Sequence, residues 1–190
     1  METRATTREQ IIQAAYRVLV ERGYDAATIK AIAREAGVAP GLLHYYFASK
    51  DELLVEVLKD ISQRYTVSGR QRSAAVPAEQ LGAVGLNDAL QRTQHNPETY
   101  RLRYELFALG LRNPALLPAV RSLLASGRSG ISHVVHTAVD ERSFDASTLA
   151  SILLACFDGL ALQRLAEPDF DIESAYSLLS RMLNCLMETT

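Results

Sequence analysis

The chain has 190 residues, 48% of them hydrophobic, and a formal net charge of −2. This composition suits one compact domain, or a small domain joined to a larger one, and is too apolar for a disordered chain. The slightly negative charge excludes a protein that is basic overall. Residues 26–50, however, hold three cations (Lys30, Arg34 and Lys50) against one acid, Glu35. A local basic face is therefore expected.

Neither a membrane span nor a secretion signal is expected. The most apolar stretch, residues 149–165, is interrupted by charged and amide side chains, and no apolar segment follows the charges at the N-terminus. Two cysteines, Cys156 and Cys185, are too few for a disulfide framework and are expected to be buried thiols. These features predict a cytoplasmic protein without a membrane partner.

Apolar residues recur at helical spacing throughout the chain and strand patterns are absent, so the predicted fold class is all-α, with about nine helices. The first helix is expected to begin at a capping box formed by Thr7 and Gln10 and to end near Gly23. Thr28 is expected to cap a second helix, and Gly37 to end it.

Pro40 suits the first turn of a short third helix, where its missing N–H costs nothing. Ser49 and Glu52 form a capping box that opens a fourth helix, expected at residues 50–65. Residues 66–78 lose periodicity and predict a loop. Further helices are expected at about residues 78–94, 97–112, 115–139, 146–166 and 172–188.

The segment from residue 28 to residue 53 predicts a helix-turn-helix. The turn at Gly37 is too short for antiparallel packing, so the next helix must cross the first steeply and can enter a DNA major groove. The Gly-Val, Tyr-Tyr-Phe and Ser-Lys-Asp-Glu-Leu pieces, at this spacing, resemble the DNA-binding signature of the TetR family of bacterial repressors. The resemblance implies a three-helix head, residues 1–50, joined through the fourth helix to an effector-binding and dimerisation body, residues 51–190.

The short third helix carries most of the predicted DNA contacts. Gly41 lets the backbone approach the groove, while Leu43 and Phe47 are expected to face inward. Ammonium groups and helix N-terminal N–H groups suit phosphates. The predicted DNA-binding residues are Thr28, Lys30, Gly41, Leu42, His44, Tyr45 and Lys50. Against the family pattern, Ala39 and Pro40 replace a hydroxyl and a cation, and His44 stands where Tyr is common.

Large rings at helical spacing in the middle of the chain are typical of a core and also suit a ligand cavity. The resemblance implies a small-molecule effector between these helices. The predicted effector pocket consists of Tyr100, Tyr104, Phe107, Leu111, His133 and Phe157. It has no cluster of one charge, so the expected effector is mostly apolar, aromatic or acyl-containing. His133 and His136 lack a third ligand at matching spacing, so neither a metal nor a cofactor is expected.

The last two predicted helices carry apolar stripes wider than one side of a small body needs. Two such helices from each subunit make a two-fold four-helix bundle, and the resemblance implies a dimer here too. The predicted dimer interface consists of Leu153, Phe157, Leu160, Arg164, Tyr176, Leu179 and Leu183. The alternative is that these stripes bury only against their own chain.

The sequence therefore predicts a homodimeric transcriptional regulator that binds an inverted-repeat DNA operator. We expect a repressor released by a small molecule. One alternative is a helical dimer whose head has lost DNA binding and docks a protein or only binds a small molecule. An enzyme is disfavoured because no phosphate loop, nucleophile elbow or paired acidic cluster is present in the sequence.

Overall fold

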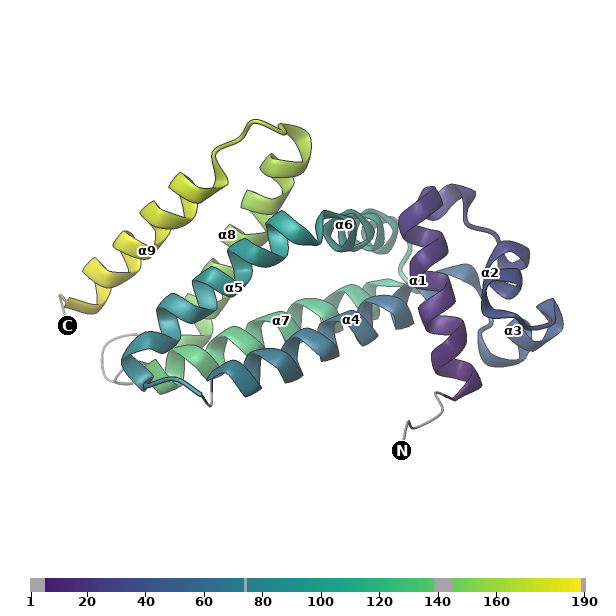
Figure 1. The fold of residues 1–190 in the computed structure, drawn as a ribbon, viewed down its shortest axis with the longest axis horizontal. Helices are drawn as coiled ribbons and strands as arrows, with labels where there is room; N and C mark the ends of the chain where they lie inside the picture. Colours follow the sequence, from purple (N-terminus) through teal and green to yellow (C-terminus); the bar gives the residue numbers. More distant parts are fainter. Residues whose placement is uncertain (1–5, 74, 139–144, 189–190) are drawn as a thin grey trace. The chain divides into compact units, whose positions relative to one another are not determined.

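A computed structural model describes residues 6–73, 75–138 and 145–188, and this part of the chain is built from helices without strands (Figure 1). The chain divides into two compact units. Unit 1 contains residues 1–63 and 101–123, and unit 2 contains residues 64–100 and 124–190. The division differs from the predicted boundary after residue 50, because residues 101–123 share a unit with the head.

Unit 1 contains the predicted three-helix head. Its elements are α1 (Thr7–Ala26), α2 (Ile29–Ala36), α3 (Pro40–Tyr46), the start of α4 (Lys50–Ser73), most of α6 (Pro97–Arg112) and the start of α7 (Leu117–Ala138). Figure 1 shows α2 and α3 together on one side of α1. The largest buried side chains of the head are Ile11, Leu19, Ile32, Leu43, Phe47, Leu53 and Leu54. These residues join the three short helices and the start of α4 into one core.

The cap of α1 lies one residue earlier than predicted. The Thr6 hydroxyl accepts from the Glu9 N–H at 3.3 Å, and the Glu9 carboxylate accepts from the Thr6 N–H at 2.7 Å. The prediction of Thr7 and Gln10 was therefore wrong. A carboxylate forms a charge-assisted bond and interacts favourably with the helix N-terminus, so Thr6 with Glu9 is the stronger pair.

The fourth helix is longer than predicted. Its cap is as expected, since the Ser49 hydroxyl accepts from the Glu52 N–H at 3.1 Å, although the Glu52 carboxylate accepts from Ala48 N–H rather than from Ser49. Residues 66–73, predicted as a loop, continue α4. No proline interrupts the chain between the start of α4 and Pro77, so polar residues without clear periodicity extend the helix.

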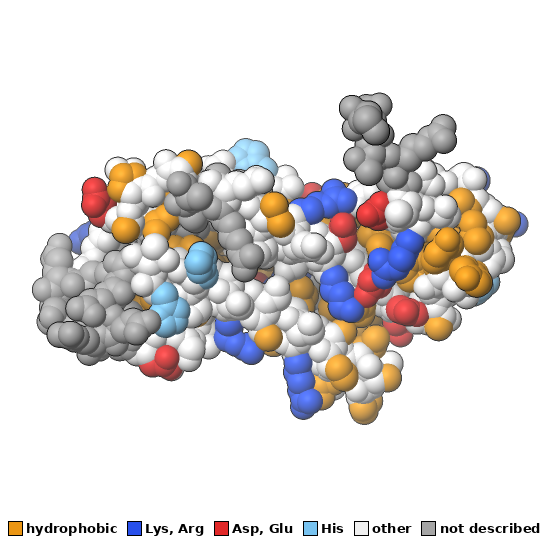
Figure 2. Space-filling model, turned by 90° about the horizontal axis from the view of Figure 1, so that it is seen from below, with side chains coloured by type: hydrophobic (Ala, Val, Ile, Leu, Met, Phe, Trp, Pro, Cys, Tyr) orange, Lys and Arg blue, Asp and Glu red, His pale blue; other side chains and the backbone are white. Residues whose placement is uncertain are grey.

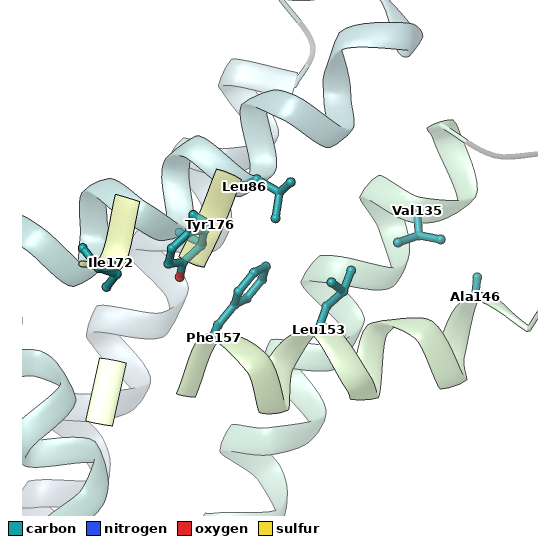
Figure 3. Close-up of a cluster of buried hydrophobic side chains, with 8 residues drawn as sticks. Leu86, Val135, Ala146, Leu153, Phe157, Ile172 and Tyr176 are labelled. Carbon is teal, nitrogen blue, oxygen red and sulfur yellow. The ribbon is translucent and has the colours of Figure 1, made fainter. Parts of the chain in front are cut away.

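Unit 2 contains the rest of α4, a 3₁₀ turn (Ala78–Gln80), α5 (Leu81–His95), the first residues of α6, most of α7, α8 (Ala146–Ala166) and α9 (Ile172–Glu188). The bounds predicted for α6, α8 and α9 are confirmed, and residue 139 of the predicted seventh helix lies outside the described residues. The core of this unit consists of Leu86, Ala89, Val135, Ala146, Leu153, Phe157, Ile172 and Tyr176 (Figure 3).

Candidate functional site

The turn between α2 and α3 depends on one glycine. Gly37 has φ +67° and ψ +30°, the left-handed conformation that side chains with a Cβ disfavour. Its neighbour Val38 donates its N–H to the Ala33 carbonyl at 3.0 Å, which satisfies the end of α2. The chain then enters α3 directly, with Pro40 in the first turn. The predicted helix-turn-helix is thus present.

The third helix has one buried and one exposed face. Leu43 and Phe47 are buried, as predicted. Gly41, Leu42, His44 and Tyr45 are exposed, and 80% of the Tyr45 surface is open to solvent. The Tyr45 ring meets the Tyr46 ring edge-on, with centroids 5.2 Å apart. The four predicted DNA-reading residues of this helix therefore lie together on its free side.

Two further predicted residues lie at the start of α2. Thr28 accepts a hydrogen bond from the Ala31 N–H at 3.1 Å, so its oxygen caps the helix while its own hydrogen can still be donated. Lys30 is exposed and has no ion pair among the described residues. The one acid of residues 26–50, Glu35, pairs with Arg17 at 2.6 Å. The cations of this segment are thus not neutralised by it.

Lys50 has a role that the sequence did not reveal. Its ammonium donates to the Tyr24 carbonyl oxygen at 2.8 Å, lies 3.5 Å from the Asp25 carbonyl oxygen, and is 4.1 Å from the centroid of the Tyr24 ring. The Tyr24 hydroxyl donates to Asp51. Burial, together with this bond, raises the pKa of Tyr24. Sequence reasoning missed Tyr24, although a tyrosine directly after the predicted helix end at Gly23 was a usable signal.

On one face of the molecule, positive and negative side chains are mixed. On the face that Figure 2 shows, Lys and Arg side chains lie among Asp and Glu side chains rather than in one large positive patch. The ion pairs of the head agree with this, since Arg8 and Lys59 both contact Glu56. Burial alone would raise the pKa of Glu56, but the hydrogen bonds from Lys59 and Arg8 outweigh it and lower that pKa. Electrostatic attraction to DNA must therefore come from a few positions.

The predicted effector-pocket residues fall in both units. In unit 1 the Tyr104 and Phe107 rings are partly buried, with centroids 6.4 Å apart, and the Arg103 guanidinium lies 4.9 Å from the Phe107 centroid. Leu111, in contrast, is 76% exposed. Leu111 follows the rings at helical spacing but lies in the last turn of α6, at the surface, so its place in the effector pocket stays a prediction.

In unit 2, Phe157 is buried and stacks on Tyr176, with ring centroids 5.9 Å apart. The Tyr100 hydroxyl lies 3.5 Å from the hydroxyl oxygen of Thr93, which is also buried. Tyr100 and Phe157 both belong to unit 2. His133 is exposed on α7, and its place in the effector pocket stays a prediction.

Three of the predicted dimer-interface residues lie in the core of their own chain. Leu153, Phe157 and Tyr176 retain only 4–8% of their surface in the single chain. Leu160, Leu179 and Leu183 are partly buried against the same core, and Arg164 is partly exposed. The interface stays a prediction, and spacing alone cannot separate the inner face of α8 from its outer face because that helix is apolar on all sides.

The structure shows which apolar residues of these helices are exposed. An outer face, which we define by these residues, consists of Ile152, Ala155, Gly159 and Leu162 on α8 and Leu178, Met182, Cys185 and Leu186 on α9. On α8 the steps are three, four and three residues, which is one helix face. Cys185 was predicted to be buried and is exposed, and Cys156 is partly buried.

Among the described helices, α8 is also long and apolar enough to cross a membrane, by length and composition alone, and 28% of its most apolar window is buried. A helix that is apolar on all sides needs partners on all sides. Its inner face has them in unit 2. An outer face of apolar and small residues at helical spacing suits another helix.

Comparison with known proteins decides the family. The family model described as bacterial regulatory proteins of the tetR family matches residues 11–57, and the model for the tetracyclin repressor-like C-terminal domain matches residues 77–184. The chain belongs to the TetR family. It is a DNA-binding transcriptional regulator.

Individual relatives agree. The chain is 31% identical to the HTH-type transcriptional regulator PksA of Bacillus subtilis, over 85% of this chain and 80% of PksA. It is 29% identical to the regulator BetI of Rhizobium meliloti, over 93% and 87% of the two chains. A putative TetR-family regulator from Rhodococcus superposes with TM-score 0.76 at 25% identity, covering 95% of this chain and 98% of that one. These matches extend through head and body alike.

Proposed function

We propose that this regulator is a homodimeric repressor that reads an inverted-repeat operator through the exposed side of α3 and is released from it by a small, mostly apolar effector. The observation that carries the proposal is the free side of α3, where Tyr45 extends into solvent beside His44 and Gly41. The Tyr45 ring touches Tyr46 only edge-on and keeps most of its surface in solvent, so it can meet a base or a sugar without unpacking the head.

The roles within the interface follow from the side chains. Base edges would be contacted by the polar ends of Tyr45 and His44 and by the apolar side chain of Leu42. Gly41 lets the backbone approach the groove. Thr28 and Lys30, at the start of α2, would hold phosphates and fix the register. Lys50 keeps donors beyond its bond to Tyr24, so its ammonium can serve the fold and a phosphate together.

The dimer would form through the outer face of α8 and α9. Ala155 and Gly159 allow close helix approach, and Ile152, Leu162, Leu178 and Met182 supply apolar area. Leu160, Arg164, Leu179 and Leu183, which are partly exposed, would border it. The two-fold axis would place two copies of α3 about one helical turn of DNA apart, ~34 Å, or somewhat more.

An effector site in the body, residues 51–190, is supported by two similar folds. A putative regulator from Saccharomonospora viridis was solved in complex with choline, with TM-score 0.75 at 23% identity. FadR from Bacillus subtilis was solved in complex with stearoyl-CoA, with TM-score 0.69 at 18% identity. Among the residues predicted for the site, we retain Tyr100 and Phe157, which belong to the same unit. A regulator of this kind acts on chromosomal DNA, so we propose a cytoplasmic location.

A gel-shift assay with the DNA upstream of the protein's own gene tests the proposal. Wild-type protein should give one specific shift, and Tyr45→Ala should weaken it by ~1–3 kcal/mol. Val20→Ala, which trims an exposed apolar residue on α1, is the control and should bind as wild type. If Tyr45→Ala binds as tightly as wild type, α3 does not read DNA. In that case a head that docks a protein becomes the better explanation.

A further inference from the structure

Unit 2 contains a buried tyrosine whose hydroxyl group makes no hydrogen bond within the described fold. Tyr176 on α9 is 4% exposed, and its hydroxyl has no hydrogen-bond partner among the described residues. Burying a hydroxyl without a partner destabilises a fold, and Phe at this position would keep the ring and remove the cost. The ring itself is well placed, stacked on Phe157 in the core (Figure 3). Packing of the ring therefore does not explain why this position has a hydroxyl group.

Side chains of α5 and α6 act on this hydroxyl. Thr93 of α5 is buried and donates its hydroxyl to the Ala89 carbonyl at 3.0 Å, and it forms no hydrogen bond to the Tyr176 hydroxyl in this geometry. Tyr100 lies 3.5 Å beyond Thr93. Arg92, also on α5, stacks its guanidinium 5.5 Å from the centroid of the Tyr65 ring and makes no salt bridge within the described ranges.

The charges near these hydroxyls have both signs. The Arg92 charge lowers the pKa of Tyr176 and that of Tyr65, while Asp158 raises the first and Glu98 raises the second. Burial raises the pKa of Tyr176 and that of Tyr65, so both remain protonated donors at neutral pH. A group that accepts hydrogen bonds and carries negative charge satisfies this arrangement.

We propose that Tyr176 and Arg92 form the polar end of the effector site, and that they take the carboxylate of an apolar acid. The carboxylate accepts from the Tyr176 hydroxyl and the Arg92 guanidinium, which suits its geometry. The apolar body of the ligand lies against Phe157 and the partly buried leucines of the same cluster, Leu90, Leu160 and Leu179. This inference rests on the proposed function, since it assumes that the body binds an effector.

The apolar part of such an acid is either an acyl chain or an aryl group, and the experiment distinguishes the two. The probes are decanoate and 4-phenylbutyrate, with decan-1-ol as the neutral control and decyltrimethylammonium as the cationic one. Binding to the full-length protein is measured by calorimetry, and operator release by gel shift. At least one acid should bind and release the operator, and the acid that binds better identifies the source. The alcohol should bind at least ~10-fold more weakly than decanoate, and the ammonium compound not at all.

Tyr176→Phe separates a binding role from a structural one. The variant should melt at the same temperature as wild type or higher, and bind the operator normally, yet bind the acid at least ~10-fold more weakly. Tyr104→Phe, which removes a hydroxyl from the predicted pocket residue of unit 1, is the matched control and should keep the wild-type affinity.

The inference is overturned if Tyr176→Phe binds the acid as tightly as wild type, or if Tyr104→Phe is the variant that loses it. It is overturned as well if the alcohol or the ammonium compound binds as well as the acids, or if neither acid binds while operator binding is intact. Failure of the wild-type protein to bind the operator, with the acids still bound, counts against the proposed function instead.

Discussion

The Lys50 ammonium lies 2.8 Å from the Tyr24 carbonyl oxygen and 4.1 Å from the centroid of the Tyr24 ring. This contact joins the first residue of α4 to the end of α1, where backbone carbonyls carry partial negative charge. Asp51, the next residue of α4, accepts from the Tyr24 hydroxyl. Two neighbouring residues of α4 thus contact Tyr24, the residue that follows the kink of α1 at Gly23, where φ is +71°. The predicted phosphate-binding lysine therefore also stabilises the head.

Replacing Lys50 by methionine should therefore have two separable effects. The free energy of unfolding should fall by about 1–2 kcal/mol, because a charge-assisted hydrogen bond and a cation–π contact are lost. The slope of log affinity against log salt should become shallower by about one, because one phosphate contact is lost. Urea denaturation and gel shifts at several salt concentrations measure the two.

Lys59→Met is the matched control for that variant, since Lys59 is exposed and pairs with Glu56 on the same helix. It should change neither quantity appreciably. A Lys50→Met protein that loses stability but keeps the wild-type salt slope would assign Lys50 to the fold alone.

Two glycines of the helix-turn-helix should respond to alanine in opposite ways. Gly37 has φ +67°, so Gly37→Ala should destabilise the head by about 1–2 kcal/mol. A Cβ built on Gly41 meets no atom within 4 Å, so Gly41→Ala should fold normally. Its methyl group would nevertheless stand on the exposed side of α3 and weaken operator binding. Thermal melts and gel shifts on both variants test this pair, and normal DNA binding by Gly41→Ala would remove Gly41 from the interface.

The parts of the head that the sequence predicted correctly depend on chemistry within a few residues. Thr28 caps α2 because its hydroxyl reaches the Ala31 N–H, and Gly37 ends α2 because it tolerates a left-handed backbone. Pro40 and Ser49 begin the next two helices for equally local reasons. Such signals survive in any tertiary context, so the turn and the exposed side of α3 could be predicted.

The contacts that the sequence did not predict join residues far apart in the chain. Lys50 meets Tyr24 26 residues earlier, and Tyr176 shares its surroundings with Arg92 and Tyr100. The spacing of residues along the chain does not predict these contacts. The faces of α8 could not be assigned from the sequence for a different reason. Leu153 and Ile152 are equally apolar, yet Leu153 is buried and Ile152 is exposed. Only the packing of α5, α8 and α9 separates them.

The cap of α8 predicts a dependence of stability on pH. Asp145 accepts from the hydroxyls and N–H groups of Thr148 and Ser147, which lowers its pKa to about 2. Because the folded pKa lies below the ordinary value of about 3.9, the carboxylate stabilises the fold fully above that value. The stabilisation is lost as pH falls from about 4 through 2.

Comparison of wild type with Asp145→Ala tests that dependence. The wild-type protein should melt at the higher temperature at pH 7, and the difference should shrink as pH falls through this window. Asp145→Asn, which can still accept from the N–H groups, should lie between the two and show a weaker dependence on pH. A difference between wild type and Asp145→Ala that stays constant from pH 7 to pH 2 would mean that the carboxylate charge contributes nothing to the cap.

The outer face of α8 predicts how the dimer can be disrupted without damage to the fold. A Cβ built on Gly159 meets no atom within 4 Å, so Gly159→Leu fits the isolated chain and removes a glycine from a helix. In a dimer that packs two copies of this face closely, the same leucine separates the helices. Sedimentation at micromolar concentration should then show monomer, and operator affinity should fall although the head is unchanged.

Gly130→Leu is the matched control, because Gly130 is an exposed helical glycine of α7 with equally open surroundings. It should remain dimeric, and a Gly159→Leu protein that also remains dimeric would place the interface on another surface.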